Sequence, residues 1–221
     1  LRILVLPAMA RLFNVQGENT AVIRNTPRPY LIMANHASVL DPFFVHNFVH
    51  IPIHYVVSDS NFRTKIVGFV LNLIGSIPKT KAVSDLETVK HIVELKRKRA
   101  IIGIFPEGQS SWDGHTLPFV RATAKLIKSL KVPVITANIR GAYLTSPRWA
   151  RRARKGRVTV RFENTFSPEG LKRMSVTEVE ETLQRALEHD EFEYQRKAKV
   201  RYVGTRLAEY VERTLFVCPQ C

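Results

Sequence analysis

The sequence predicts an α/β fold, in which a mixed but largely parallel sheet is flanked by helices within a single domain. Short apolar runs typical of buried strands alternate with segments of helical periodicity. The length of 221 residues suits one domain, and an apolar share of 45% is enough for a sizeable core. Strands that alternate with helices usually pair in parallel, because each helix returns the chain across the sheet.

Each element follows from its local pattern. Strands are expected at apolar or alternating runs, namely 14–19 (a short strand or turn), 30–34, 53–57, 75–79, 100–105, 132–139 and 158–162. Helices are expected at amphipathic segments, namely 42–50, 60–74, 84–99, 119–130 and 175–187. Two capping boxes, Ser84 with Glu87 and Ser175 with Glu178, predict helix starts.

The net charge of +15 is large for this length. It predicts an anionic partner, which charge alone leaves open between nucleic acid, anionic lipid headgroups and a phosphate-bearing substrate. Cysteines occur only at Cys218 and Cys221, so the body has no disulfide framework and we expect a cytosolic setting.

Both ends of the chain suggest a trimmed fragment, since it starts at Leu1 and stops at Cys221. We expect residues 1–13 to be the end of an N-terminal membrane-contacting helix. No apolar run approaches the ~20 residues of a spanning helix. Residues 216–221 are expected to begin a truncated zinc-ribbon-like tail, because Cys218 and Cys221 have two-residue ligand spacing. A structural zinc there would need a second cysteine pair further along the chain; the alternative is a harmless tail.

The most informative stretch is Asn-His-Ala-Ser-Val-Leu-Asp at 35–41, between the apolar strand 30–34 and a helix. Asp41 is expected to be the N-cap and Pro42 the first helical residue. The turn can bring the Asp41 carboxylate against the His36 imidazole. This contact would fix the tautomer and leave the other ring nitrogen to accept a proton. The alternative is a capped helix beside a surface histidine.

Three polar loops each follow an apolar strand directly: the His36 turn, residues 75–81 and the loop at 107–108. In parallel sheets, ligands bind beyond the carboxyl ends of the strands. We therefore expect the three loops to line one crevice.

Four segments resemble, in order and approximate spacing, the four blocks of the glycerophospholipid acyltransferases. They are the stretch at 35–41, Gly-Ser-Ile-Pro-Lys at 75–79, Phe-Pro-Glu-Gly at 105–108 and Val-Pro-Val-Ile at 132–135. The sequence is most similar to the 1-acylglycerol-3-phosphate acyltransferase branch, over roughly residues 14–140. The resemblance implies an acyltransferase domain at 14–215. It would transfer a fatty acyl group from acyl-CoA or acyl carrier protein to a lysophospholipid, most simply 1-acyl-sn-glycerol 3-phosphate, giving phosphatidic acid.

The resemblance also implies the roles of individual residues. His36 would take the hydroxyl proton, and Asp41 would orient the ring and stabilise the imidazolium. No Cys or Ser nucleophile is required, since the acceptor hydroxyl is itself the nucleophile, and no cofactor is expected for catalysis. The substrate-binding residues implied are Gly75, Lys79, Lys81, Glu107 and Gly108. For Glu107 the alternative is a carboxylate that anchors its loop.

Two positions depart from the family pattern. Lys79 stands where the second block usually carries Arg, so charge is kept but bidentate phosphate recognition is lost. Ser110 stands where the third block commonly has Arg, so a cation is missing. Lys79, Lys81 or the cations of helix 119–130 would compensate, or the acceptor is a different lysolipid.

The basic run at 148–157 predicts a membrane contact, through Arg148, Trp149, Arg151 and Arg152, on an anionic surface. The alternative is a solvated loop. The resemblance places the protein at the cytoplasmic face of the membrane, either peripheral or anchored by a missing N-terminal segment.

Two other binding classes are weighed and not expected. His46, His50 and His54 recur every four residues like metal ligands, but Pro52 breaks the helix before His54. The competing function is a basic nucleic-acid-binding protein with a zinc ribbon. Because the cations show no regular aromatic interleaving and no known motif appears, no nucleic-acid partner is expected.

Overall fold

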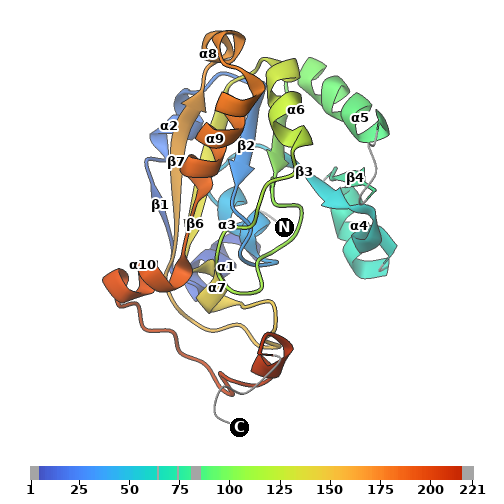
Figure 1. Cartoon of the computed structure of the whole chain (residues 1–221). Coiled ribbons are helices and arrows are strands. Elements are labelled where there is room, and N and C mark those ends of the chain that lie inside the picture. Colours follow the sequence, from blue (N-terminus) through green and yellow to red (C-terminus); the bar gives the residue numbers. More distant parts are fainter. Residues whose placement is uncertain (1–4, 64, 74, 81–85, 216–221) are drawn as a thin grey trace.

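A computed structural model describes residues 5–63, 65–73, 75–80 and 86–215. Within them one seven-stranded sheet has the order β1-β7-β6-β2-β5-β3-β4 (Figure 1). Its strands are β1 Val15–Glu18, β2 Tyr30–Ala34, β3 Ile53–Ser58, β4 Ile77–Lys79, β5 Ile101–Ile104, β6 Val134–Arg140 and β7 Val158–Phe166. All neighbouring strands pair in parallel except β6 and β7, which are antiparallel. The predicted fold class, a mixed but largely parallel sheet, is confirmed.

Helices lie on both faces of this sheet (Figure 1). They are α1 Val5–Leu12, α2 Ala21–Asn25, α3 Asp41–His46, α4 Lys65–Leu73, α5 Leu86–Arg97, α6 Ala122–Leu130, α7 Ala142–Thr145, α8 Pro168–Arg173, α9 Val176–Leu187 and α10 Glu191–Ala198. Two 3₁₀ helices span Asp59–Arg63 and Val211–Arg213. In the part of the chain described, no helix is long and apolar enough to cross a membrane.

Strand β2 lies at the centre of the sheet, between β6 and β5, and all five of its residues are buried. Tyr30, Ile32 and Ala34 join a core shared with α2, α3 and α7. Leu31 and Met33 join a second core on the opposite face, with α5, α6, α8 and α9. A strand covered on both faces reads as a continuous apolar run, which is why the sequence located this strand accurately. Burying each such side chain contributes about 1.5–3 kcal/mol.

Several element boundaries differ from those expected. The helix expected at 60–74 is a 3₁₀ helix, Asp59–Arg63, followed by α4. The helix expected at 119–130 begins only at Ala122, because the Val120 amide donates to the Pro106 carbonyl at 2.9 Å and holds that segment on the loop after β5. The capping box at Ser175 and Glu178 is confirmed at the start of α9.

Some expected features lie outside the described residues. They are the Ser84 half of the other capping box, Lys81, residues 1–4 and the tail at 216–221 with Cys218 and Cys221. The division into segments 1–13, 14–215 and 216–221 therefore stays a prediction.

The carboxyl ends of β2, β5 and β6 meet at one edge of the sheet, and antiparallel β7 starts there. The chain after α9 runs along this edge through α10 (Figure 1). Two isolated bridges attach it, one between His115 and Asp190 and one between Lys155 and Val203. The edge expected to hold the site is thus enclosed by segments far apart in sequence.

Candidate active site

The turn after β2 starts at Asn35, whose buried side chain takes the place of backbone in the sheet. Its Nδ2 donates to the Ile139 carbonyl at 2.9 Å, and the Ile139 amide donates to its Oδ1 at 2.6 Å. These bonds continue the β2–β6 ladder one residue beyond the strand and fix the point where the turn leaves the sheet. No local pattern predicts this role of Asn35, because its partner is 104 residues away.

Asp41 folds back across this turn. Its Oδ2 lies 2.9 Å from His36 Nδ1 and accepts hydrogen bonds from the Ala37 and Ser38 amides, both at 2.7 Å. The expected N-cap role is wrong: Leu40 is the N-cap of α3, without a side-chain cap, and Asp41 is the first helical residue. The carboxylate binds the turn instead of the helix amides, because the turn presents two backbone donors and an imidazole to it.

Burial governs the electrostatics of Asp41. Complete burial raises the pKa of its carboxyl, while the hydrogen bonds from His36, Ser38 and Ala37 act in the opposite direction. Its second oxygen, Oδ1, is buried without a hydrogen-bond partner among the described residues. The ionised form of Asp41 therefore depends on the contacts of Oδ2, and within the described residues His36 is the side chain that contacts this oxygen.

His36 is held at its ring and at its backbone. The ring stacks on Phe105, with centroids 4.3 Å apart at 29°, while Nδ1 meets Asp41. The His36 amide donates to Glu107 Oε1 at 2.6 Å, and its carbonyl accepts from the Ser111 amide at 2.8 Å. The side chain remains 19% exposed. The ring is thus oriented by Asp41 with its Nε2 on the side away from that carboxylate.

Glu107 connects the third block to the His36 turn. Its two oxygens accept from the amides of His36, at 2.6 Å, and Leu117, at 2.9 Å. Burial raises the pKa of this carboxyl to about 8. Gly108, at φ +72°, provides the turn that follows it. These contacts match the loop-anchoring alternative for Glu107; substrate binding by Glu107 and Gly108 stays a prediction.

A closely packed group of residues beside His36 includes two further histidines. Its members are Asn35, His36, Ala37, Glu107, Ser111, Gly114, His115, Thr116 and His189. His189 Nε2 lies 3.3 Å from Glu191 Oε2, and the other oxygen of this fully buried Glu191 accepts from the Gly141 amide at 2.7 Å. No local pattern identifies either residue: His115 lies in the loop after β5, and His189 reaches this edge only because the chain after α9 returns to it.

The second block lies apart from His36. Gly75, at φ +67°, contacts His54 Nδ1 through its carbonyl at 2.8 Å. Lys79 ends β4, which β3 and β5 separate from β2, so the backbones are ~14 Å apart at three strand spacings. Lys79 thus lies at the carboxyl ends of the strands, as predicted. Its strand, β4, is however the outermost strand of the sheet and is three strands away from β2. Its role, like those of Gly75 and the undescribed Lys81, stays a prediction.

A cation reaches the third block from elsewhere in the chain. Arg148 Nη1 donates to the Ser110 carbonyl at 2.9 Å, and its guanidinium lies 4.3 Å from the ring centre of Trp112. Ser110 is the position at which the resemblance identifies a missing cation. Arg148, 38 residues away, places a guanidinium beside it.

The membrane contact predicted for Trp149 is wrong. Its side chain is only 8% exposed, and its Nε1 donates to the Tyr143 hydroxyl at 3.0 Å, which in turn donates to the Trp112 carbonyl. A buried indole needs such a partner, and the apolar core around it supplies the burial. Trp112 instead is 41% exposed, while Arg148, Arg151 and Arg152 are exposed as expected.

Metal binding finds no support in the described part of the chain. It contains no group of three or more His, Cys, Asp or Glu side chains arranged to hold an ion. The three spaced histidines do not lie on one helix, since α3 ends at His46 and His54 belongs to β3, where its Nδ1 contacts the Gly75 carbonyl. The cysteine pair, Cys218 and Cys221, lies outside the described residues, so its zinc stays a prediction.

Comparisons with known proteins agree with this arrangement. A family model described as Acyltransferase matches residues 13–140, more than half of the chain. A chloroplastic 1-acyl-sn-glycerol-3-phosphate acyltransferase of Brassica napus is 25% identical over 130 residues, covering 58% of this chain and 37% of the relative. The 1-acyl-sn-glycerol-3-phosphate acyltransferase of Saccharomyces cerevisiae is 24% identical over 160 residues, covering 70% and 52%. The chain thus spans about half or less of these relatives.

A solved structure has the same fold. The crystal structure of the 1-acyl-sn-glycerophosphate acyltransferase of Thermotoga maritima superposes with a TM-score of 0.69 at 20% identity. The match covers 92% of this chain and 83% of that one. The shared fold thus extends past residue 140, over most of the described chain.

Proposed function

The chain belongs to the acyltransferase family, and on that premise we propose that it transfers a fatty acyl group to the hydroxyl of a lysophospholipid. The donor is acyl-CoA or acyl carrier protein, the acceptor is 1-acyl-sn-glycerol 3-phosphate and the product is phosphatidic acid. The observation that carries the proposal is the 2.9 Å contact between His36 Nδ1 and Asp41 Oδ2, in the first family block and at the carboxyl end of the central strand.

In the proposed mechanism His36 is the general base. The acceptor hydroxyl is too weak an acid to ionise near neutral pH, so Nε2 takes its proton as the oxygen attacks the thioester carbonyl. The new C–O bond forms, the C–S bond breaks, and the imidazolium returns the proton to the departing thiolate. Asp41 holds the ring through Nδ1 and stabilises its positive charge. The reaction as proposed calls for no cofactor.

Glu107 has a positioning role in this mechanism. Together with Ser111 it forms a backbone clamp, in which both the amide and the carbonyl of His36 are hydrogen-bonded. By accepting from the His36 amide, its carboxyl group fixes the end of β2 against the loop after β5. Ser111 closes the same clamp from the other side by donating to the His36 carbonyl. With both backbone groups held, the imidazole is preorganised for the proton transfer rather than ordered during it.

Arg148 is proposed to bind the phosphate of the acceptor. A guanidinium has five donors, and the Ser110 carbonyl uses one of them at 2.9 Å. Stacking on Trp112 orients the planar group, and a planar fork suits bidentate phosphate contact better than a lysine does. A different lysolipid acceptor remains the second candidate, because both Lys79 and Ser110 depart from the family pattern.

We also propose peripheral association with an anionic membrane, at its cytoplasmic face. Exposed Arg148, Arg151 and Arg152 supply the charge, and half-exposed Trp112 replaces buried Trp149 as the interfacial aromatic residue. The net charge of +15 favours such a surface over a neutral one.

An acceptor screen tests the function. Labelled acyl-CoA and acyl carrier protein would be supplied with a set of lysophospholipids, and products identified by mass spectrometry. The expected result is phosphatidic acid formed by the wild type and not by His36→Ala. Transfer to another lysolipid would select the second candidate. A folded protein that transfers to none of them, yet binds DNA in a salt-sensitive way, would contradict the proposal and favour a nucleic-acid-binding protein.

A further inference from the structure

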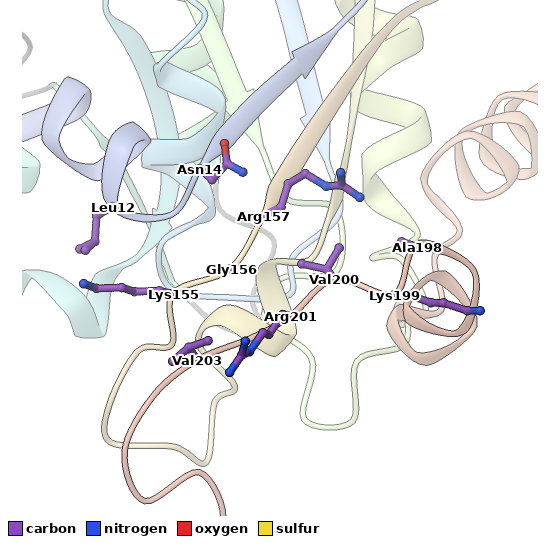
Figure 2. Close-up of a pocket in the computed structure, with 10 residues that line it drawn as sticks. All are labelled: Leu12, Asn14, Lys155, Gly156, Arg157, Ala198, Lys199, Val200, Arg201 and Val203. Carbon is purple, nitrogen blue, oxygen red and sulfur yellow. The ribbon is translucent and has the colours of Figure 1, made fainter.

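A second pocket, separate from the His36 turn, opens at the same edge of the sheet. Its volume is about 470 Å³, and it lies among the end of α1, the start of β7 and the segment after α10 (Figure 2). Its lining residues are Leu12, Asn14, Lys155, Gly156, Arg157, Ala198, Lys199, Val200, Arg201 and Val203. Strands β6 and β7 lie between it and β2. The mechanism proposed above uses none of these residues.

The charges of the pocket have one sign. Four lining residues are Lys or Arg, and none is Asp or Glu. Figure 2 shows the four cationic side chains on different sides of the pocket, with Lys155 and Lys199 pointing in opposite directions. A concave surface with uncompensated positive charge attracts an anion.

The half-buried Arg157 provides a second, independent observation. Its Nε is fully buried and has no hydrogen-bond partner among the described residues. Buried polar atoms in native structures are nearly always bonded, and an unpaired buried donor costs about 1–3 kcal/mol or more if charged. Arg157 thus has a donor that no described residue uses.

The walls are fixed without a ligand. The amides and carbonyls of Lys155 and Val203 bond each other reciprocally at 2.8 Å. The Tyr202 ring packs so closely on Gly156 that a Cβ there would lie 2.2 Å from it, and its hydroxyl donates to the Arg157 carbonyl at 3.2 Å. A preorganised site loses less free energy on binding than one that must be ordered.

We propose that this pocket binds a phosphate ester, at a site distinct from the catalytic one. Guanidinium groups match phosphate geometry, and two of the four lining cations are arginines. Leu12, 48% exposed, and Val203, 50% exposed, add apolar surface to the lining. A phospholipid at a membrane surface has both a phosphate ester and an apolar part, and is the first candidate ligand. A soluble organic phosphate is the second, because it carries the same phosphate ester.

Vesicle binding by the full chain tests the proposal for the lipid source. Co-sedimentation with phosphatidylcholine vesicles containing phosphatidic acid would compare the wild type with Arg157→Gln/Arg201→Gln. The matched control is Lys172→Gln/Arg173→Gln, which removes the same charge from two exposed residues of α8, at the opposite edge of the sheet. We expect at least a tenfold loss of affinity in the pocket variant, the effect of losing a charge-assisted contact, and under about threefold in the control.

Calorimetric titration with coenzyme A and with glycerol 3-phosphate, without vesicles, tests the soluble source. Saturable binding that the pocket variant loses and the control keeps would identify a soluble phosphate ester as the ligand. If the two variants lose vesicle affinity equally, and neither soluble compound binds in an arginine-dependent way, the pocket is not a phosphate site and the proposal is overturned.

Two further measurements keep the result interpretable. Arg157 is half-buried, so Arg201→Gln, at an exposed position, is tested alone in case the double variant does not fold. Binding is also measured in His36→Ala, which should retain it fully. Since the assays need no turnover, failure of this site and failure of the proposed acyl transfer are distinguishable.

Discussion

The turn at 35–41 and the basic segment at 148–157 lie at the same edge of the sheet but are organised in opposite ways. In the turn, the decisive contact joins His36 to Asp41, five residues apart. In the basic segment, the decisive contacts are long-range: Arg148 bonds Ser110, and Lys155 bonds Val203. The comparison teaches that local chemistry builds the proposed base, while distant segments determine what surrounds it.

His36→Ala tests the turn with the largest expected effect. General-base catalysis is typically worth ~10²–10⁴-fold, so kcat should fall at least that far. The matched control is His91→Ala, an exposed histidine of α5, which should keep the wild-type rate. Acyl transfer in mixed micelles measures both, with circular dichroism to verify folding. A folded His36→Ala protein that keeps a tenth of the rate would rule out the proposed base.

Asp41→Asn separates charge from geometry in the same turn. Because Oδ1 has no hydrogen-bond partner in the described part of the chain, an asparagine can place its NH₂ there and keep its oxygen on His36, Ala37 and Ser38. The neutral amide cannot stabilise an imidazolium, so kcat should fall by at least ~10²-fold. Unfolding by urea should show a loss of only about 1–3 kcal/mol. A rate within threefold of wild type would show that Asp41 acts by geometry alone.

Trp149→Ala tests whether the basic segment is core or surface. Removing a buried tryptophan typically costs about 3–5 kcal/mol of unfolding free energy. Trp112→Ala, at the exposed neighbour, should leave stability within about 0.5 kcal/mol and weaken binding to anionic vesicles. Urea unfolding and vesicle co-sedimentation of both variants test whether Trp149 is the buried residue and Trp112 the membrane-contacting one. A Trp149→Ala protein that is stable but loses vesicle binding would contradict the burial of Trp149 and show that this residue contacts the membrane.

These two tryptophans also illustrate how far the sequence could lead. The strand 30–34, the capping box at Ser175 and the approach of Asp41 to His36 depend on neighbouring residues, and the sequence predicts all of them. Trp149 reads as interfacial because arginines flank it. Its burial depends on Tyr143 and on core residues of distant strands, which no local pattern encodes.

The N-cap role predicted for Asp41 is also wrong because local propensity does not determine which contacts a side chain makes. Asp41 before Pro42 matches a helix start, but the same carboxylate can also bind the amides of the preceding turn. Propensity alone does not choose between two sets of backbone donors. The sequence does not predict the sites of His115, His189 and Arg148. Each lies beside a segment that is distant in sequence and adjacent only in the folded protein.

Arg148→Gln tests the contact between the basic segment and the third block. If its guanidinium binds the acceptor phosphate, the acceptor KM should rise about ten- to a hundredfold, the effect of losing a bond to a charged group, with the donor KM unchanged. Lys172→Gln on α8 is the control for charge, and steady-state kinetics in mixed micelles measure both. An unchanged acceptor KM in Arg148→Gln, together with a raised one in Lys79→Ala, would return the phosphate site to the second block.

Glu107→Gln carries the smallest expected effect and tests the clamp on the turn. Burial raises the pKa of Glu107 to about 8, so between its unfolded value near 4.5 and about 8 the folded protein binds more protons than the unfolded chain. The free energy of unfolding should therefore fall as pH rises through this window, by at most about 1.4 kcal/mol per pH unit.

Glutamine does not titrate, so urea unfolding of Glu107→Gln at pH 5 to 8 should show a flatter dependence of the unfolding free energy on pH. Glutamine keeps one acceptor, for the His36 or the Leu117 amide, so stability at pH 8 should change little beyond the loss of one hydrogen bond. Identical pH slopes in wild type and variant would show that Glu107 is ionised throughout and clamps the turn as a permanent carboxylate.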